Sequence, residues 1–445
     1  MPTMTRYRRR WAALAVLLTA EAMNLLDATI VQVAGPAIHA DLPGPAADVP
    51  WFSAAYTLPF AAFLITGGRL GDVFGRARVF KLGVAGFVLA SLVCAAADDS
   101  GLLIGARAVQ GAAAALIIPQ TIGLIRALFD GAELAKALGT IGPVMGLSAV
   151  TGPLLGGLLT QAVSWRAVFL VNVPLGLAVL LAARLLREDR AATRPRLDVV
   201  GTLLVAAGAG VFVYPLIDPA GTNWGLLAAG AAVLAVFGFH QRRTAAPLVE
   251  PSLFAHRGFP AALAGSLLFF AVMTGLMQVV PMQLQLGLGV DVRTAGLTLL
   301  PLSAGLAVSS YFAGARLVPK FGPRVMFAGL ALLTAGLVAA LTLGAGAYAW
   351  ALALCGLGMG TFTVPFFAAA LDRVRPHETG SAAGLLNAVQ QLGGTLGVAL
   401  LGGLYLGTGT AAVALGLGAA LAVAAAIAVV PLSRESGRLS SRRGR

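Results

Sequence analysis

Fourteen long apolar segments, separated by short polar loops, constrain this sequence more than any other feature. Most of them contain the roughly 20 residues that a helix needs to cross the hydrocarbon core of a bilayer. Only helices and closed barrels satisfy their backbone polar groups in lipid, and the period-two alternation typical of barrel strands is missing. We therefore predict an all-α polytopic membrane protein with spans at 11–38, 51–70, 79–97, 101–122, 138–160, 166–186, 199–217, 223–240, 259–285, 296–316, 325–345, 347–371, 381–405 and 411–431.

The distribution of charge sets the orientation of these helices. Charged residues make up only 11% of the chain, whereas a soluble domain has about 25%. A formal net charge of +13 would favour a nucleic-acid partner in a soluble protein. Here the arginines gather in alternate loops, as expected when basic loops stay in the cytoplasm. We predict a multi-pass protein of the cytoplasmic membrane, surrounded by lipid, with both termini cytoplasmic and no nucleic-acid partner.

Residue types that bind metals or carry out covalent catalysis are sparse. The two cysteines lie in apolar runs, and the four histidines are assigned to loops. The sequence contains neither a phosphate-binding loop nor a nucleophile elbow. We therefore expect no enzyme activity, no metal and no cofactor.

An internal repeat indicates two related halves. Residues 67–75 and 314–322 match in register at Gly, Arg, Leu, Phe and Gly. Both copies follow a predicted span on the cytoplasmic side, so the repeat is parallel, as between the halves of a transporter. Eight predicted helices separate the copies, where a six-helix repeat would place six. We predict a tail at 1–10, a six-helix bundle at 11–186, a linker with two extra helices at 187–258, a second six-helix bundle at 259–431 and a basic tail at 432–445.

The first copy of the repeat has a recognisable pattern. Residues 68–78 read Gly-Arg-Leu-Gly-Asp-Val-Phe-Gly-Arg-Ala-Arg, which resembles the signature loop of the major facilitator superfamily, although Val73 and Ala77 replace basic positions common there. Its glycines allow helix ends to approach closely, and Asp72 can pair with a nearby arginine. We expect a clamp that holds one conformation, formed by Gly68, Leu70, Asp72, Gly75, Arg76 and Arg78.

Three further stretches resemble the fourteen-helix drug:proton antiporters of that superfamily. Residues 26–36 are similar to their first-helix motif, and residues 164–176 are similar to the start of their sixth helix. The predicted fifth span resembles the superfamily's antiporter motif, in which a proline bends a helix that has a flat glycine face; the residues concerned are Gly152, Pro153, Gly156 and Gly157. The resemblance implies the major facilitator fold and proton-coupled export by alternating access, with the proton gradient as the energy source.

Three charged residues lie well inside the predicted spans: Glu21, Asp27 and Arg107. Each costs several kcal/mol in lipid, so each is a functional candidate. Asp27 and Arg107 share the outer half of the membrane, and Glu21 lies near its middle, on the same face of the helix as Asp27. A movement that changes the separation of an acid and a cation would couple proton binding to conformation. We predict that Asp27 carries the coupling proton, that Arg107 tunes it, and that Glu21 is the alternative carrier.

Polar and methionine side chains among aliphatic residues suit broad recognition of amphipathic compounds. Taken singly, each of these polar residues is better explained by a hydrogen bond between helices. We predict a substrate cavity lined by Asn24, Gln32, Gln110, Met145, Gln278, Gln283, Asn387 and Gln390.

The function that follows is proton-coupled efflux of amphipathic drugs, antibiotics or toxic metabolites, by a monomer. A proton-coupled uptake symporter is an alternative, but an anion importer would require more than one basic residue in the cavity. A non-transporting membrane scaffold is a further alternative.

Overall fold

The computed structural model describes residues 9–190, 196–217, 223–254, 258–342, 348–371, 374–375 and 378–432. Most of the two predicted tails, 1–10 and 432–445, therefore lies outside the described residues. Within them the chain forms only helices and the turns that connect them, which confirms the predicted fold class. Residues in lipid can satisfy their backbone groups in this way.

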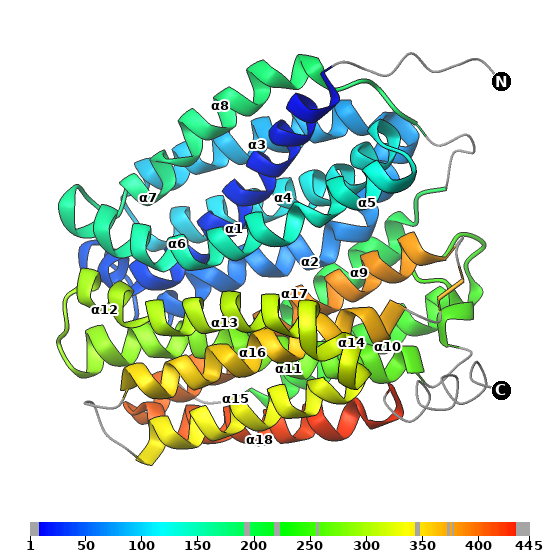
Figure 1. Cartoon of the computed structure of the whole chain (residues 1–445). Helices are drawn as coiled ribbons and strands as arrows, with labels where there is room; N and C mark the ends of the chain where they lie inside the picture. The colour runs from blue at the N-terminus through cyan, green and yellow to red at the C-terminus, as the bar shows by residue number, and fades with distance from the viewer. Residues whose placement is uncertain are drawn as a thin grey trace, which may run out of the picture.

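The N-terminal bundle lies in the upper part of Figure 1. The fifth crossing is broken into α5 and α6, and the sixth into α7 and α8. Its helices are α1 (Arg10–Asp41), α2 (Asp48–Phe74), α3 (Arg76–Ala96), α4 (Ser100–Leu128), α5 (Gly131–Gly139), α6 (Ile141–Ala162), α7 (Ala167–Leu170) and α8 (Asn172–Ala182), followed by a 3₁₀ turn, η1 (Ala183–Leu185).

The C-terminal bundle lies below it in the same view (Figure 1). Its first and second crossings each contain a π-helical segment, η3 and η4. Its elements are η2 (Pro251–Phe254), α11 (Gly258–Met282), η3 (Gln283–Gly287), α12 (Val292–Thr298), α13 (Leu300–Phe312), η4 (Ala313–Leu317), α14 (Val318–Phe321), η5 (Gly322–Arg324), α15 (Val325–Thr342), α16 (Tyr348–Leu371), α17 (Thr379–Thr408) and α18 (Ala411–Ala428).

Thirteen stretches of the described residues are long and apolar enough to cross a membrane. One of them, Val292–Thr342, has 51 residues, which is more than twice what a crossing needs. The chain turns within it at Gly322, which has a φ of 61°. Counted as two crossings, this stretch brings the total to fourteen. Gly75, at the corresponding position of the repeat, also has a positive φ, of 107°, and positive φ favours glycine.

The two extra helices, α9 (Val199–Ile217) and α10 (Trp224–Arg243), pack against each other beside α2 and α17. Arg69 at the end of α2 donates to the backbone carbonyls of Arg196, Ala246 and Pro247, which flank this pair. At the start of α9, Asp198 accepts from the backbone of Gly201 and from the side chains of two α10 residues, His240 and Gln241. Burial alone would raise the pKa of Asp198, but these bonds lower it below its ordinary value.

The structure corrects one detail of the sequence analysis. His39 and His240 lie inside α1 and α10 and not in loops; His240 is also the last residue of the span predicted at 223–240. Both helices extend by about three residues beyond the apolar run, because helices continue into the polar zone where their last carbonyls meet water. The remaining two histidines, His256 and His377, lie outside the described residues.

One contact between the bundles lies at the end of the molecule that we call the acidic side, because Asp41, Asp48 and Asp291 lie there; the opposite end, where α1 begins, is the basic side. On the acidic side α6 packs against α12 without intervening side chains. A Cβ on Gly157 would lie 2.8 Å from the carbonyl oxygen of Val292, and a Cβ on Gly296 would lie 2.5 Å from that of Pro153. Glycine is required for so close an approach.

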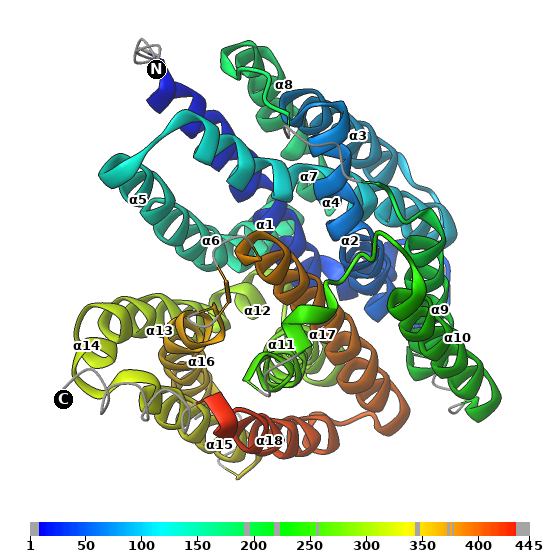
Figure 2. The same cartoon turned by 90° about the vertical axis from the view of Figure 1, so that its right-hand side faces the viewer.

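On the basic side the same helix has no such partner. A Cβ on Gly142 or Gly146 of α6 would have no neighbour within 4 Å. Figure 2, which looks onto this side, shows α5 and α14 well apart. The described conformation is therefore closed between α6 and α12 on the acidic side and separated at α5 and α6 on the basic side.

We expect Gly296→Ala to open the acidic side, because the added methyl meets backbone and overpacking costs about 1–3 kcal/mol. The readout is disulfide formation between cysteines placed at Ala149 and Ser303, whose backbone oxygen and hydroxyl are bonded at 3.1 Å, in a chain whose two native cysteines are replaced by serine. Cross-linking should fall about tenfold, the factor for about 1.4 kcal/mol. Gly146→Ala is the matched control and should leave the extent of cross-linking unchanged. Equal cross-linking in both variants would contradict this account of closure.

Candidate functional site

A buried ion pair lies at the centre of the N-terminal bundle. Nη1 of Arg107 on α4 donates to Oδ2 of Asp27 on α1, and both residues have no exposed surface. The sequence places the two partners where they can meet because α1 and α4 run in opposite directions across the membrane. Breaking such a pair by removing one partner leaves an uncompensated buried charge, which costs about 3–5 kcal/mol.

Three further side chains complete the surroundings of Asp27. Gln110 and Asn172 donate to Oδ1 of Asp27 at 2.9 and 2.7 Å, and both also donate to the hydroxyl of Ser91. Nη1 of Arg107 also donates to Oε1 of Gln110, at 2.6 Å. Both carboxylate oxygens are therefore bonded, as an ionised acid in a low-dielectric interior requires. Gln110 is expected in the substrate cavity, but its side chain bonds to Asp27, Arg107 and Ser91.

Arg107 connects the ion pair to α2. Its Nε donates to the carbonyl oxygen of Phe52 at 2.9 Å, and its guanidinium lies over the ring of Tyr56, 4.3 Å from the centroid. The next residue, Ser53, donates to Oε1 of Gln278 on α11 at 3.1 Å. The ion pair is thus one residue along α2 from a contact between the two bundles.

A second polar group lies on α1 between the ion pair and the basic side. Asn24 accepts from the hydroxyl of Tyr56, and Glu21 lies one turn before it, beside Thr121 of α4. Nδ2 of Asn24 and Oε2 of Glu21 are buried and have no hydrogen-bond partner among the described residues. Asn24, expected in the substrate cavity, therefore faces α2 inside the N-terminal bundle.

The signature loop forms ion pairs within the N-terminal bundle. Nε and Nη2 of Arg76 donate to Oδ1 of Asp72, at 3.1 and 2.8 Å, and Nη1 donates to Asp189 at 2.6 Å. Arg78 pairs with Glu188 at 3.7 Å. Gly75 lies against the same glutamate, whose Oε1 would be 2.4 Å from an added Cβ. The loop thus clamps the chain that follows α8, while the remaining members, Gly68 and Leu70, lie on the last turns of α2.

The antiporter-like helix makes a different contact with each of its glycines. Gly152 and Gly156 face α1, where an added Cβ would lie 1.9 Å from the hydroxyl of Thr29 and 2.9 Å from the carbonyl oxygen of Ile30. Gly157 faces α12 of the other bundle. Pro153 lies inside α6. The motif therefore packs one helix against both a neighbour in its own bundle and the opposite bundle.

The other expected cavity residues are spread along the contact between the bundles. Gln278 is fully buried and bonded to Ser53, whereas Gln283 accepts from the backbone of Ala411 at the start of α18. Gln32 is buried and Met145 is exposed. Asn387 and Gln390 are partly exposed on α17. These residues lie on several different helices, and the contacts of the described residues do not place all of them around one cavity.

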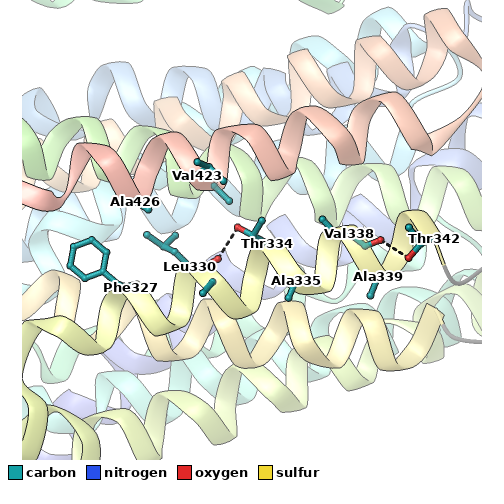
Figure 3. Close-up of a pocket in the computed structure, with 11 residues that line it drawn as sticks. Phe327, Leu330, Thr334, Ala335, Val338, Ala339, Thr342, Val423 and Ala426 are labelled. Carbon is teal, nitrogen blue, oxygen red and sulfur yellow. Dashed lines mark hydrogen bonds between the residues drawn. The ribbon is translucent and has the colours of Figure 1, made fainter.

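The structure does contain one wide groove, of about 710 Å³, between α15 and α18 (Figure 3). Eleven residues line it, and all are apolar except two threonines. Thr334 and Thr342 donate to the carbonyls of Leu330 and Val338 of their own helix. The groove lies on the side of the C-terminal bundle away from α1 to α8 (Figure 2) and has none of the expected site residues.

Several residues of the site were missed by the sequence analysis: Ser91, Asn172, Tyr56 and Gly296. Asn172 stands inside an apolar run and inside the stretch 164–176 that resembles the antiporters, so a buried amide was a usable signal. Tyr56 and Ser91 have no such signal, because either residue type is common in membrane helices. Gly296 is identified only by its contact with α6.

The comparisons with known proteins agree with this architecture. The chain is 43% identical over 423 residues to the "Probable actinorhodin transporter" of Streptomyces coelicolor, covering 90% of this chain and 73% of the relative. It is 39% identical over 413 residues to "Puromycin resistance protein pur8" of Streptomyces alboniger, covering 88% and 81%. A crystal structure of the peptide transporter POT has the same fold, with a TM-score of 0.69 at 15% identity, over 96% of this chain and 94% of that one.

The model of one family matches most of the chain, at residues 17–398. The match includes the ion pair, the signature loop, the antiporter-like helix and most of the second bundle. The chain belongs to the Major Facilitator Superfamily.

Proposed function

We propose that the chain is a proton-coupled antiporter that exports amphipathic antibiotic-type compounds from the cytoplasm. The observation that carries this proposal is the buried Asp27–Arg107 pair, which is expensive in lipid and lies one residue along α2 from a contact between the bundles. The relatives named for actinorhodin transport and puromycin resistance support export as the direction.

The basic side is the cytoplasmic side in this proposal, and both termini lie there. The described conformation, separated at α5 and α6 on the basic side, then faces inward. A compound enters between the bundles, where Gln32, Met145, Gln278, Gln283, Asn387 and Gln390 offer polar and adaptable contacts. The protein acts as a monomer in the lipid bilayer and takes its energy from the proton gradient, without a cofactor.

Proton binding acts through Arg107. In the inward-facing state Asp27 is ionised and held by Arg107, Gln110 and Asn172. Once export has brought the protein to the outward-facing state, a proton taken up from outside neutralises Asp27 and releases the guanidinium, which still bonds to the backbone of Phe52. A shift of α2 at Phe52 changes the adjacent contact between Ser53 and Gln278. The two bundles then rock back to the inward-facing state, because each state has its own set of contacts.

A susceptibility assay and a vesicle assay test this function together. Expression in an efflux-deficient host should raise resistance to puromycin or to actinorhodin. In inverted vesicles with an acidic interior, the same compounds should dissipate the pH gradient. Asp27→Asn mimics the protonated acid, so it should abolish uptake driven by the gradient and leave exchange without a gradient detectable; Asp41→Asn, on the acidic side, is the control. Full coupling in Asp27→Asn would remove Asp27 from the mechanism.

Orientation is tested separately with reporter fusions. Both termini and the linker 241–258 should report as cytoplasmic, because basic loops remain inside. A fusion within 286–295 should report as external. An external signal from 241–258 would overturn the assignment of the two sides.

The signature loop is expected to control turnover. Asp72→Asn removes the charge that holds Arg76, so it should slow the transport cycle and leave the affinity for a bound compound nearly unchanged. Binding to purified protein and the initial rate of export measure the two quantities. Asp98→Asn, at an exposed turn, is the control. Wild-type export by Asp72→Asn would show that the clamp has no role.

A further inference from the structure

A column of polar groups runs along α1 inside the N-terminal bundle. Glu21, Asn24 and Asp27 are three residues apart, so they lie on one face of the helix. They face α2 and α4 of their own bundle, through Tyr56, Thr121 and Arg107. The column therefore extends from the ion pair toward the basic side without passing between the two bundles.

The two carboxyl groups of this column are too far apart for direct proton transfer. Six residues of helix separate them, a rise of about 9 Å, whereas a hydrogen bond joins atoms about 2.5–3.0 Å apart. Tyr56 fills part of this gap, because its ring lies beneath Arg107 and its hydroxyl donates to Asn24. An intermediate carrier is still needed between the Tyr56 hydroxyl and Glu21, because the amide of Asn24 does not pass a proton on.

Two buried polar atoms without a hydrogen-bond partner among the described residues lie where that carrier is needed. Nδ2 of Asn24 is a donor without an acceptor, and Oε2 of Glu21 is an acceptor without a donor, among the described residues. Asn24 is only 4% exposed. One water molecule accepts from the amide and donates to the carboxylate, and buried waters are typically held by two to four such polar groups. Side chains three residues apart on a helix are close enough to share it.

We propose that Asn24 and Glu21 bind a structural water, and that Glu21 is the inner station through which the coupling proton leaves Asp27 for the cytoplasm. This inference rests on the proposed antiport function. It assigns the proton a route inside the N-terminal bundle and leaves the space between the bundles to the exported compound. The titratable groups that face the column are Tyr56 from α2, Cys94 from α3 and Arg107 from α4.

The transfer balances without any further reactant. The O–H bond of neutral Asp27 breaks, and the Tyr56 hydroxyl accepts this proton. The Tyr56 hydroxyl turns from Asn24 to the water and gives its own proton to it. The water next to Glu21 gives up one proton to the carboxylate and receives another from the Tyr56 hydroxyl. Arg107 then pairs again with ionised Asp27, and Glu21 later releases its proton toward the basic side. The net change is one proton moved from Asp27 to the cytoplasm.

Infrared spectroscopy of the purified full-length chain tests this inference without any exported compound. Spectra are recorded after rapid jumps between acid and alkaline pH, and the carbonyl band of protonated carboxyl groups is followed. Glu21→Gln should remove one component and slow the loss of the Asp27 component by about tenfold or more, equivalent to about 1.4 kcal/mol of barrier. Asn24→Leu should keep the Glu21 component but shift its frequency, because the water is lost.

Thr19 on the same helix provides the matched control variant. Thr19→Val removes a hydroxyl on the same helix that bonds only to the carbonyl of Ala15, and it should behave as wild type. An unchanged spectrum in Glu21→Gln, or an unshifted band in Asn24→Leu, would overturn the inference. So would loss of the Glu21 component in Asp27→Asn. If no component depends on Asp27 at any pH, the proposed function itself fails, whatever Glu21 does.

Discussion

The ion pair between Asp27 and Arg107 is the interaction on which the rest of the site depends. Two charges in the interior of a membrane bundle are tolerated only with full pairing and hydrogen bonding. Gln110, Asn172 and the carbonyl of Phe52 supply those bonds, so four helices of one bundle converge on a single pair. A change of protonation at Asp27 therefore alters contacts on several helices at once. Arg107 extends that influence to α2, and α2 reaches the opposite bundle through Ser53.

Close helix packing determines which conformation the bundles adopt. Glycines at Gly157 and Gly296 let α6 and α12 approach backbone to backbone on the acidic side. Such a contact is either made or not made, because a packed interface does not deform continuously. The opposite end of α6 has glycines without neighbours. The same helix thus closes one side while the other remains separated, and an exporter that alternates between two states needs this property.

Much of the fold could be predicted from the sequence, because lipid leaves few alternatives. Hydropathy located the helices, and the repeat identified two similar halves; Gly75 and Gly322 now appear as turns with positive φ at matching positions. The helix ends differ from the predicted ones, as at His39, because the apolar run stops at the edge of the lipid whereas the helix continues beyond it. The pairing of Asp27 with Arg107 followed from their depth. The contacts of the glutamines could not be predicted, because an amide in a membrane helix can bind a substrate or bond to another helix equally well. Only the packing of the helices decides between the two, as it does for Gln110.

The central claim is that protonation of Asp27 rocks the two bundles. Its most direct test is the distance between spin labels at Gly142 on α6 and Tyr311 on α13, both exposed on the basic side, measured by pulsed electron paramagnetic resonance across a range of pH. The account predicts that acidification lengthens this distance in the wild-type protein, as the protonated bundles rock to the inward-facing state, and that Asp27→Asn keeps the long distance at every pH. A response to pH in Asp27→Asn equal to that of the wild type would contradict the account.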